Sequence, residues 1–194
     1  MALLLVLLIP LIIIVALAVI IVLVWIGYYN RFVVLSNRIK NSLSQIDVQL
    51  KKRADLIPNL VETVKGYAKH EAKIMKEVSD ARGMLVNANA SGKMDARMKA
   101  GDALQGALGR LFAVAENYPN LKANENFLNL QTELSSIEDK IAYARQAYND
   151  SIMSFDNSVQ TFPGNVFAGQ KFKAQAGQYI KIPEADKAPV KVSF

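Results

Sequence analysis

Apolar residues first form one unbroken run and then recur at helical spacing along the rest of the chain. No residue from Ala2 to Ile26 is charged. As a helix this run would span roughly 37 Å, whereas the hydrocarbon core of a bilayer is about 30 Å thick. We therefore expect residues 1–27 to form a transmembrane anchor, with Trp25 at its interfacial end. A cleaved signal peptide is the alternative, but it requires a basic start, a shorter apolar core and small residues at its exit.

Beyond the anchor, apolar positions are spaced three and four residues apart. One such row is Ile57, Leu60, Val64, Tyr67, Glu71, Ile74, Val78, Ala81 and Leu85, in which Glu71 is the one polar member. This spacing is typical of helices that pack in coiled-coil-like bundles, and no segment shows the period of two of a strand. It predicts helices over about 28–54, 57–88 and 121–161, with a thinner one near 98–115. The predicted fold is all-α, with an elongated antiparallel bundle of about four helices over residues 28–163.

Turn-forming residues separate these segments. Pro58 is expected to end or bend the first helix, Asn87–Gly92 to form a turn, and Pro119 to stop the thin helix. That helix is expected to be weak because Gly101, Gly106 and Gly109 interrupt it. Phe162-Pro163-Gly164 ends the last helix. Residues 164–194 show no sustained period and are expected to form a flexible basic tail, with the patch around residues 167–172 as a candidate for folding back.

Charge suggests where the chain lies. The formal net charge is +6, and five lysines against two acidic residues give the tail +3. Beside a membrane such an excess favours anionic lipid over nucleic acid as a partner, although ordinary solubility also accounts for it. Arg31, Arg38 and Lys40 follow the apolar run, so the positive-inside rule places the N-terminus outside and the bundle in the cytoplasm. We expect a single-pass protein of the bacterial inner membrane.

The segment Lys51–Glu71 contains most of the residues that could form a reactive or metal-binding site. His70 precedes Glu71, but position 74 is Ile, and the chain has no second histidine and no cysteine. A zinc-hydrolase motif is thereby excluded, and no metal or cofactor is expected. We expect His70 or Glu71 to hydrogen-bond across the bundle, or Glu71 to face Lys69 or Lys73 on the helix surface. A pH-sensing role for His70 remains open.

The other charged residues of the segment favour structural roles. Asp55 is expected to cap the helix that begins near Pro58, and Asp47 to pair with Lys51. Asp55 and Glu62 are seven residues apart, too far to share a proton. The basic run that ends at Arg53 is expected to be a solvated helix face, with phosphate or lipid contact as the alternative. No catalytic residue is expected. The candidate structural or interaction residues are Arg53, Asp55, Pro58, Glu62, His70, Glu71 and Tyr118.

Several blocks resemble the LemA family. They are SQIDVQLKKRADLIPNLVETVKGYAKHE at 44–71, ENYPNLKANENFLNLQTEL at 116–134, IEDKIAYARQAYND at 137–150 and FPGNVFA at 162–168. Ser44 departs from relatives, in which an aromatic residue often stands before the serine-glutamine pair. The resemblance implies a bacterial, single-pass, helical protein with no established enzymatic activity.

Two functional hypotheses follow from the resemblance. The first is a self-associating protein that organises or remodels the membrane, with the lipid bilayer and other copies of the chain as its partners. The second is an adaptor of a membrane protease in envelope quality control, which would bind through the basic tail or the thin helix. An enzyme would need a pocket that the sequence does not indicate.

Overall fold

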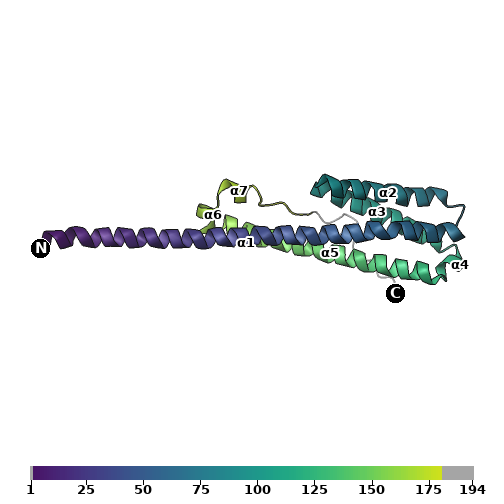
Figure 1. Cartoon of the computed structure of the whole chain (residues 1–194), viewed down its shortest axis with the longest axis horizontal. Helices are drawn as coiled ribbons and strands as arrows, with labels where there is room; N and C mark the ends of the chain where they lie inside the picture. The colour runs from purple at the N-terminus through teal and green to yellow at the C-terminus, as the bar shows by residue number, and fades with distance from the viewer. Residues whose placement is uncertain (1, 181–194) are drawn as a thin grey trace, which may run out of the picture. The chain divides into compact units, whose positions relative to one another are not determined.

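The protein is built from helices. The computed structural model describes residues 2–180, with side chains from Leu8 onward, and every regular element in that range is a helix. The helices are α1 (Ala2–Tyr67), α2 (Ala72–Ser91), α3 (Met94–Ala115), α4 (Pro119–Lys122), α5 (Glu125–Gln160), α6 (Gly164–Phe167) and α7 (Gln170–Lys173) (Figure 1). The all-α prediction, with a long apolar N-terminal helix followed by packed helices, is confirmed.

The first helix continues directly from the apolar run into the packed part of the chain. Its apolar stretch has a mean hydropathy of 3.4 over 18 residues and none of it is buried, so α1 is long and apolar enough to cross a bilayer. The predicted helix end at Pro58 is wrong, because α1 extends to Tyr67. The chain turns instead at residues 68–71, where the Glu71 amide donates to the Ala68 carbonyl.

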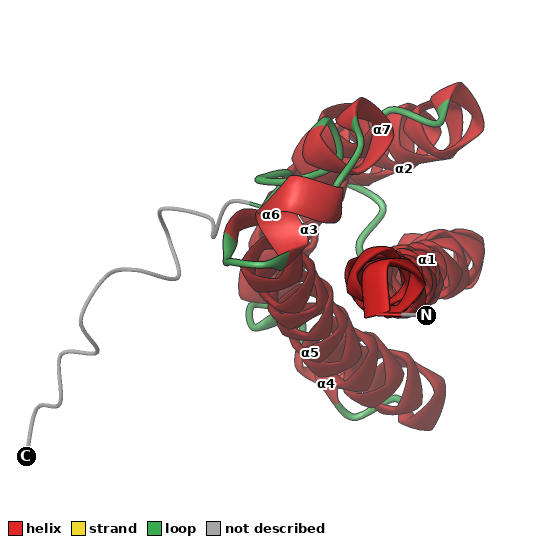
Figure 2. Ribbon diagram, turned by 90° about the vertical axis from the view of Figure 1, so that its left-hand side faces the viewer, coloured by secondary structure: helices red, strands yellow, loops and turns green. Residues whose placement is uncertain are grey.

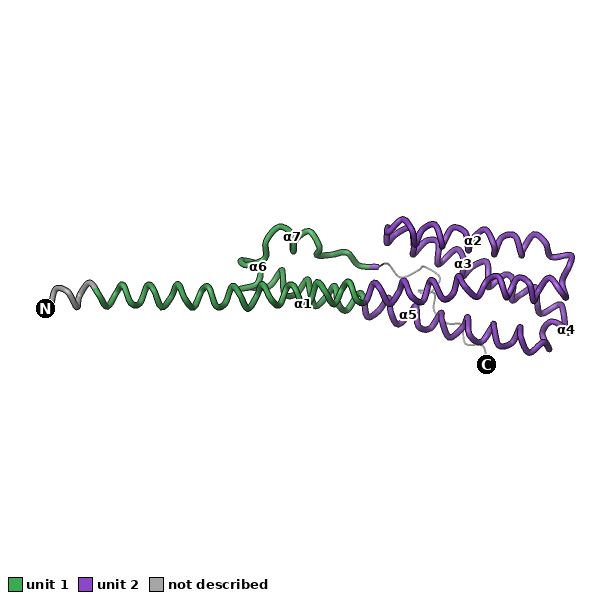
Figure 3. The backbone as a smooth tube through the Cα atoms, in the orientation of Figure 1, with its two compact units in different colours: residues 1–41, 148–179 green, residues 42–147, 180–194 purple. Residues whose placement is uncertain are grey.

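The chain divides into two compact units, each of which contains part of α1 and part of α5 (Figure 3). Unit 1 comprises the chain up to residue 41 and residues 148–179. Unit 2 includes residues 42–147. Each unit has its own buried side chains.

Unit 2 is a bundle of α2, α3 and the adjoining parts of α1 and α5. Figure 2 shows α2 and α3 as neighbours, and the short turn at Gly92 and Lys93 makes them antiparallel. Fully or almost fully buried apolar side chains come from all four helices: Ile46, Leu50, Ile57, Leu60, Val78, Leu85, Leu104, Leu108, Leu111, Leu134, Ile137 and Ile141. Each contributes roughly 1.5–3 kcal/mol relative to an exposed side chain.

The turns of unit 2 differ in part from the predictions. Residues 87–91 belong to α2 rather than to a turn, and the helix ends at Gly92, whose φ of 71° favours glycine. Ala88 in this stretch is buried, which favours continuing the helix. The turn after α3 lies where it was expected, but Pro119 also begins α4. Asn124 then caps α5, because its Oδ1 accepts the Phe127 amide at 3.0 Å.

Unit 1 contains more structure than the sequence predicts. Residues 164–180, which were expected to belong to a flexible tail, include α6 and α7, and Phe172 is buried among aromatic rings. The aromatic contacts are made by residues far apart in the sequence, which is why periodicity does not reveal them. The rest of the expected basic tail, residues 181–194, lies outside the described residues.

Candidate interaction sites

Glu71 and Tyr118 meet at the turn between α1 and α2. The Tyr118 hydroxyl donates to Glu71 Oε1 at 3.0 Å, and this bond, together with desolvation, raises the pKa of the Tyr118 phenol. Nearby, Asn124 Nδ2 donates to the Tyr67 hydroxyl at 3.0 Å. Both bonds join the first turn to the segment between α3 and α5. The structure thus places Glu71 in a hydrogen bond across the bundle, whereas His70 lies exposed in the turn.

Pro58 is accommodated inside α1 by an arginine from another helix. Proline has no N–H, so the carbonyl four residues earlier, that of Ala54, loses its helical donor. Ala54 is buried, and its carbonyl accepts a hydrogen bond from Nε of Arg82 on α2 at 2.9 Å. Arg82 therefore replaces the missing donor, which explains why the helix does not end at this proline.

The remaining carboxylates of the segment make short-range surface pairs. Asp55 lies inside α1 and pairs with Lys51 at 3.1 Å, so the predicted helix cap is wrong, as is the predicted pairing of Lys51 with Asp47. Glu62 pairs with Lys65 at 2.6 Å. Such exposed pairs contribute about 0–1 kcal/mol, and these carboxylates do not converge on a common site.

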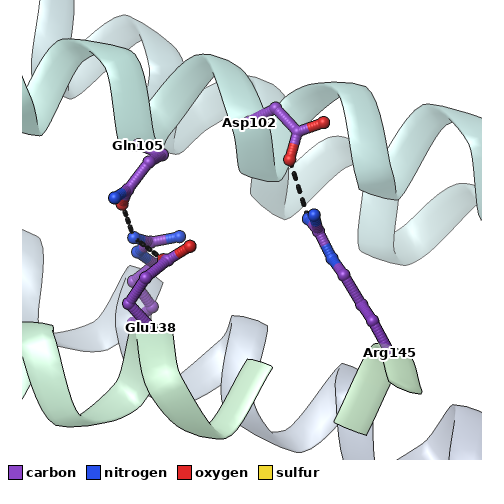
Figure 4. A network of polar contacts seen from close by, with 5 residues as sticks. Asp102, Gln105, Glu138 and Arg145 are labelled. Atoms are coloured by element: carbon purple, nitrogen blue, oxygen red, sulfur yellow. Dashed lines mark hydrogen bonds and ion pairs between the residues drawn. The ribbon is translucent and has the colours of Figure 1, made fainter. Parts of the chain in front are cut away.

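Arg53 lies in the interior of unit 2 rather than on a solvated face. Its side chain is 2% exposed, and its guanidinium donates to Gln105 on α3 and pairs with Glu138 on α5 (Figure 4). Burial lowers the pKa of the guanidinium, and the Glu138 carboxylate opposes that shift. The prediction of a solvated basic face is therefore wrong for Arg53, although Lys51 and Lys52 are exposed.

Two further arginines join helices of unit 2 in the same way. Arg145 on α5 reaches Asp102 on α3 at 2.7 Å (Figure 4), and Arg97 on α3 reaches Asp47 on α1 at 2.5 Å. Asp47 is thus engaged by another helix instead of Lys51. Because the arginine of each pair is largely withdrawn from water, removing its acidic partner would leave a poorly solvated charge. These ion pairs between helices determine which faces of the helices pack against one another.

The interior polar cluster does not have the composition of a ligand site. A cavity of about 240 Å³ lies beside Arg53 and is also lined by Gln105, Gln131, Glu138 and Asp139. Its lining carries Glu138 and Asp139 against Arg53, and Arg53 is already paired with Glu138, so the buried cation is not free to bind an anion. In the described part of the chain no three His, Asp or Glu side chains are grouped so as to hold a metal ion.

A groove lies on the surface of unit 2 between α1 and α5. It measures about 500 Å³ and its walls include small, apolar and charged side chains, among them Ser44, Val48, Ser136, Asp139, Lys140, Tyr143 and Ala144. We call this surface the α1–α5 groove. Tyr143 is 72% exposed and Val48 is 48% exposed, so the groove presents apolar surface that the described residues do not cover.

Aromatic side chains link α1 to the end of the described chain in unit 1. Tyr28 stacks on Phe167 with ring centroids 5.8 Å apart, and Phe172 contacts Tyr29 and Phe32 at 5.8 and 5.2 Å. Such contacts contribute about 0.5–1.5 kcal/mol beyond their buried area. They join α6 and α7 to the part of α1 that follows the apolar run.

Hydrogen bonds hold the residues after α7 in place. The amide of Gly177, whose φ is 77°, donates to both carboxylate oxygens of buried Asp156 at 3.0 and 3.2 Å. The Tyr148 hydroxyl donates to the Gln178 carbonyl at 3.1 Å, and burial raises the pKa of this phenol. Asp156 and Tyr148 were not predicted as site residues, because their partners lie more than twenty residues away along the chain.

The comparison with known proteins decides the family. The LemA family model matches residues 42–194, most of the chain. The chain belongs to the LemA family. This LemA protein is 28% identical to Protein LemA from Metamycoplasma hominis, in a match that covers 88% of this chain and 76% of the relative.

MamQ proteins are also similar to this LemA protein. Magnetosome protein MamQ 1 and Magnetosome protein MamQ 2 from Paramagnetospirillum magneticum are each 29% identical to it, over 72% of this chain. The match spans 60% of the length of each MamQ protein, so these relatives have substantial sequence outside the shared region. The apolar N-terminal helix and the similarity to these relatives together indicate that this LemA protein is a membrane-associated helical protein.

Proposed function

We propose that this LemA protein is a non-enzymatic scaffold whose copies associate through the α1–α5 groove and thereby organise or remodel the bacterial membrane. The supporting observation is the exposure of Tyr143 on the rim of that groove. A tyrosine that is 72% exposed places a large apolar ring in water. Tyrosine is also enriched at the centres of protein interfaces, where burial of its ring contributes most to binding.

Shape favours a second copy of the chain as the occupant. Ser44, Ser136 and Ala144 are small, and they leave a groove of about 500 Å³ between α1 and α5. In a two-fold symmetric pair the same patch serves both partners, so each copy would offer its Tyr143 to the groove of the other.

The charged side chains that line the α1–α5 groove are also self-complementary. Asp139 and Lys140 are adjacent on α5, and both line the groove. In a two-fold interface a contact between two different residues occurs twice, so Asp139 of one copy can pair with Lys140 of the other while Lys140 of the first pairs with Asp139 of the second. A partner whose surface carries charge of one sign could not pair with both Asp139 and Lys140. The groove is therefore better suited to self-association than to a strongly acidic or basic partner.

The similarity to MamQ proteins also supports the proposal. MamQ proteins are named as magnetosome proteins. We extend to this chain only the expectation that it helps to organise a membrane-associated structure. The described residues contain no feature that favours a protease adaptor over a scaffold.

Mass in solution tests the scaffold. The full chain in mild detergent is expected to be an oligomer by light scattering. The double variant Val48→Ser/Tyr143→Ser should weaken association roughly tenfold or more, because a two-fold interface loses each side chain twice. The matched control is Met84→Ser/Val86→Ser, which removes exposed apolar side chains from α2 and should leave the oligomer unchanged.

A different result would contradict the scaffold. If the unaltered protein were monomeric in detergent and in chemically cross-linked membranes, self-association would be excluded. Capture of a membrane protease by that monomer would support the adaptor instead.

A further inference from the structure

Two large apolar side chains project from unit 1 into solvent beside α6. Phe162 is 83% exposed and Val166 is 68% exposed, and they lie on either side of Gly164. Two large exposed apolar side chains four residues apart are candidates for a contact surface. The groove proposed for self-association lies in unit 2 and does not include them.

The contacts of α6 place these side chains beside the end of the apolar run of α1. The run ends at Ile26, and Tyr28 stacks on Phe167 at the end of α6. Figures 1 and 3 show α6 alongside α1, closer than α7 to the N-terminal end of that helix. If the apolar run crosses the bilayer, α6 lies at the level where α1 leaves the hydrocarbon, which is where interfacial aromatic residues lie.

The position of α6 is held by a close backbone approach. A Cβ atom on Gly164 would lie 2.0 Å from the Ser158 carbonyl oxygen and 3.3 Å from the Tyr28 ring, so only glycine fits. On α7, the buried Phe172 packs on Tyr29. The two exposed side chains are therefore presented from a segment that is fixed against α1.

Basic side chains lie close to the same level. Lys171 and Lys173 are exposed on α7, and Arg31 is exposed one turn beyond Tyr28 on α1. Positive side chains at this depth attract the headgroups of anionic lipids. The combination of apolar tips and flanking lysines is typical of segments that lie in the membrane interface.

We propose that Phe162 and Val166 insert into the interfacial layer of the bilayer beside α1, and that Lys171 and Lys173 bind anionic lipid headgroups there. Unit 1 then contacts the membrane at a second point in addition to the anchor. This contact is independent of self-association. It depends on the apolar run of α1 spanning the bilayer.

Depth-dependent quenching tests the insertion. The chain has no cysteine, so each single variant carries one label. The full chain with Phe162→Cys or Val166→Cys is labelled with an environment-sensitive fluorophore and reconstituted into vesicles whose lipids carry a quencher on the acyl chain. Leu17→Cys, in the apolar run, is the deep control. Asn37→Cys is the aqueous control, because it lies ten residues, or about 15 Å, beyond Gly27 on α1.

Quenching at positions 162 and 166 should lie clearly above that at position 37 and below that at position 17. Quenching equal to that at position 37 would overturn the insertion. A blue-shifted emission without quenching by lipid would also overturn it, since the probe would then be covered by protein. If position 17 itself were not quenched, the transmembrane assignment would fail, which is a distinguishable result.

The lipid headgroup is tested with the same label. In vesicles that contain phosphatidylglycerol, quenching at position 162 should exceed that in pure phosphatidylcholine. Lys171→Gln/Lys173→Gln should remove this difference, whereas Lys76→Gln/Lys99→Gln, two exposed lysines of unit 2, should not. A difference that persists without Lys171 and Lys173 would overturn their role.

Discussion

At the scale of single residues, the structure shows how a proline can lie within a long helix. Pro58 removes a donor, and Arg82 supplies one from a different helix to the buried carbonyl of Ala54. A buried carbonyl without a partner costs about 1–3 kcal/mol, so the arginine and the proline form a coupled pair.

A double-mutant cycle measures this coupling. Arg82→Met keeps much of the side-chain packing but removes the donor, and should lower the free energy of unfolding by about 1–3 kcal/mol. In the Pro58→Ala background the new amide can donate to Ala54, so the same Arg82→Met change should cost less. Denaturant unfolding followed by circular dichroism provides the four values. Equal costs of Arg82→Met in the two backgrounds would show that Arg82 does not compensate for the proline.

The interior arginines show why sequence reasoning fails at this scale. Arg53 follows two exposed lysines, and its neighbours in the chain give no sign that it is buried. Its partners Gln105 and Glu138 lie on two other helices, more than fifty residues away. Glu71, which occupies a position in an apolar row of the sequence, lies in the turn between α1 and α2 and accepts a hydrogen bond from Tyr118.

At the scale of the elements, periodicity predicts the helices but not all of their ends. The apolar row through Val64 and Val78 keeps its spacing across the turn at residues 68–71, because four residues correspond to about one helical turn. A break there is invisible in the pattern, whereas Pro58 is visible but does not break the helix. The sequence does not predict α6 and α7 for a related reason, since they are too short to show a period, although it offers the patch around residues 167–172 as a candidate for folding back.

The glycines of α3 provide a test at this scale. Gly109 has open space where a Cβ would lie, so Gly109→Ala should stabilise the protein by about 0.5–1 kcal/mol through helix propensity. Gly101 is buried, and its Cβ would approach Leu50 Cδ2 to 3.2 Å, so Gly101→Ala should gain less or destabilise. Thermal unfolding of the two variants compares them directly. A larger gain at position 101 than at 109 would contradict the packing between α1 and α3.

At the scale of the whole molecule, the fold and family were predictable but the contact surfaces were not. Hydropathy reveals the apolar helix, and the blocks at 44–71 and 116–150 indicate the LemA family. The α1–α5 groove depends on side chains that are nearly a hundred residues apart, such as Val48 and Tyr143. Surfaces of this kind become visible only after the helices have been packed.

The proposed scaffold requires that copies of this LemA protein meet through the α1–α5 groove. The most direct measurement is cross-linking of the single-cysteine variant Tyr143→Cys in native membranes with a short thiol-specific cross-linker. Lys99→Cys, on an exposed position of α3, is the control. We predict a dimeric product for Tyr143→Cys and much less for Lys99→Cys at equal expression. Equal yields at the two positions, or no dimer at position 143, would show that copies do not meet through the α1–α5 groove.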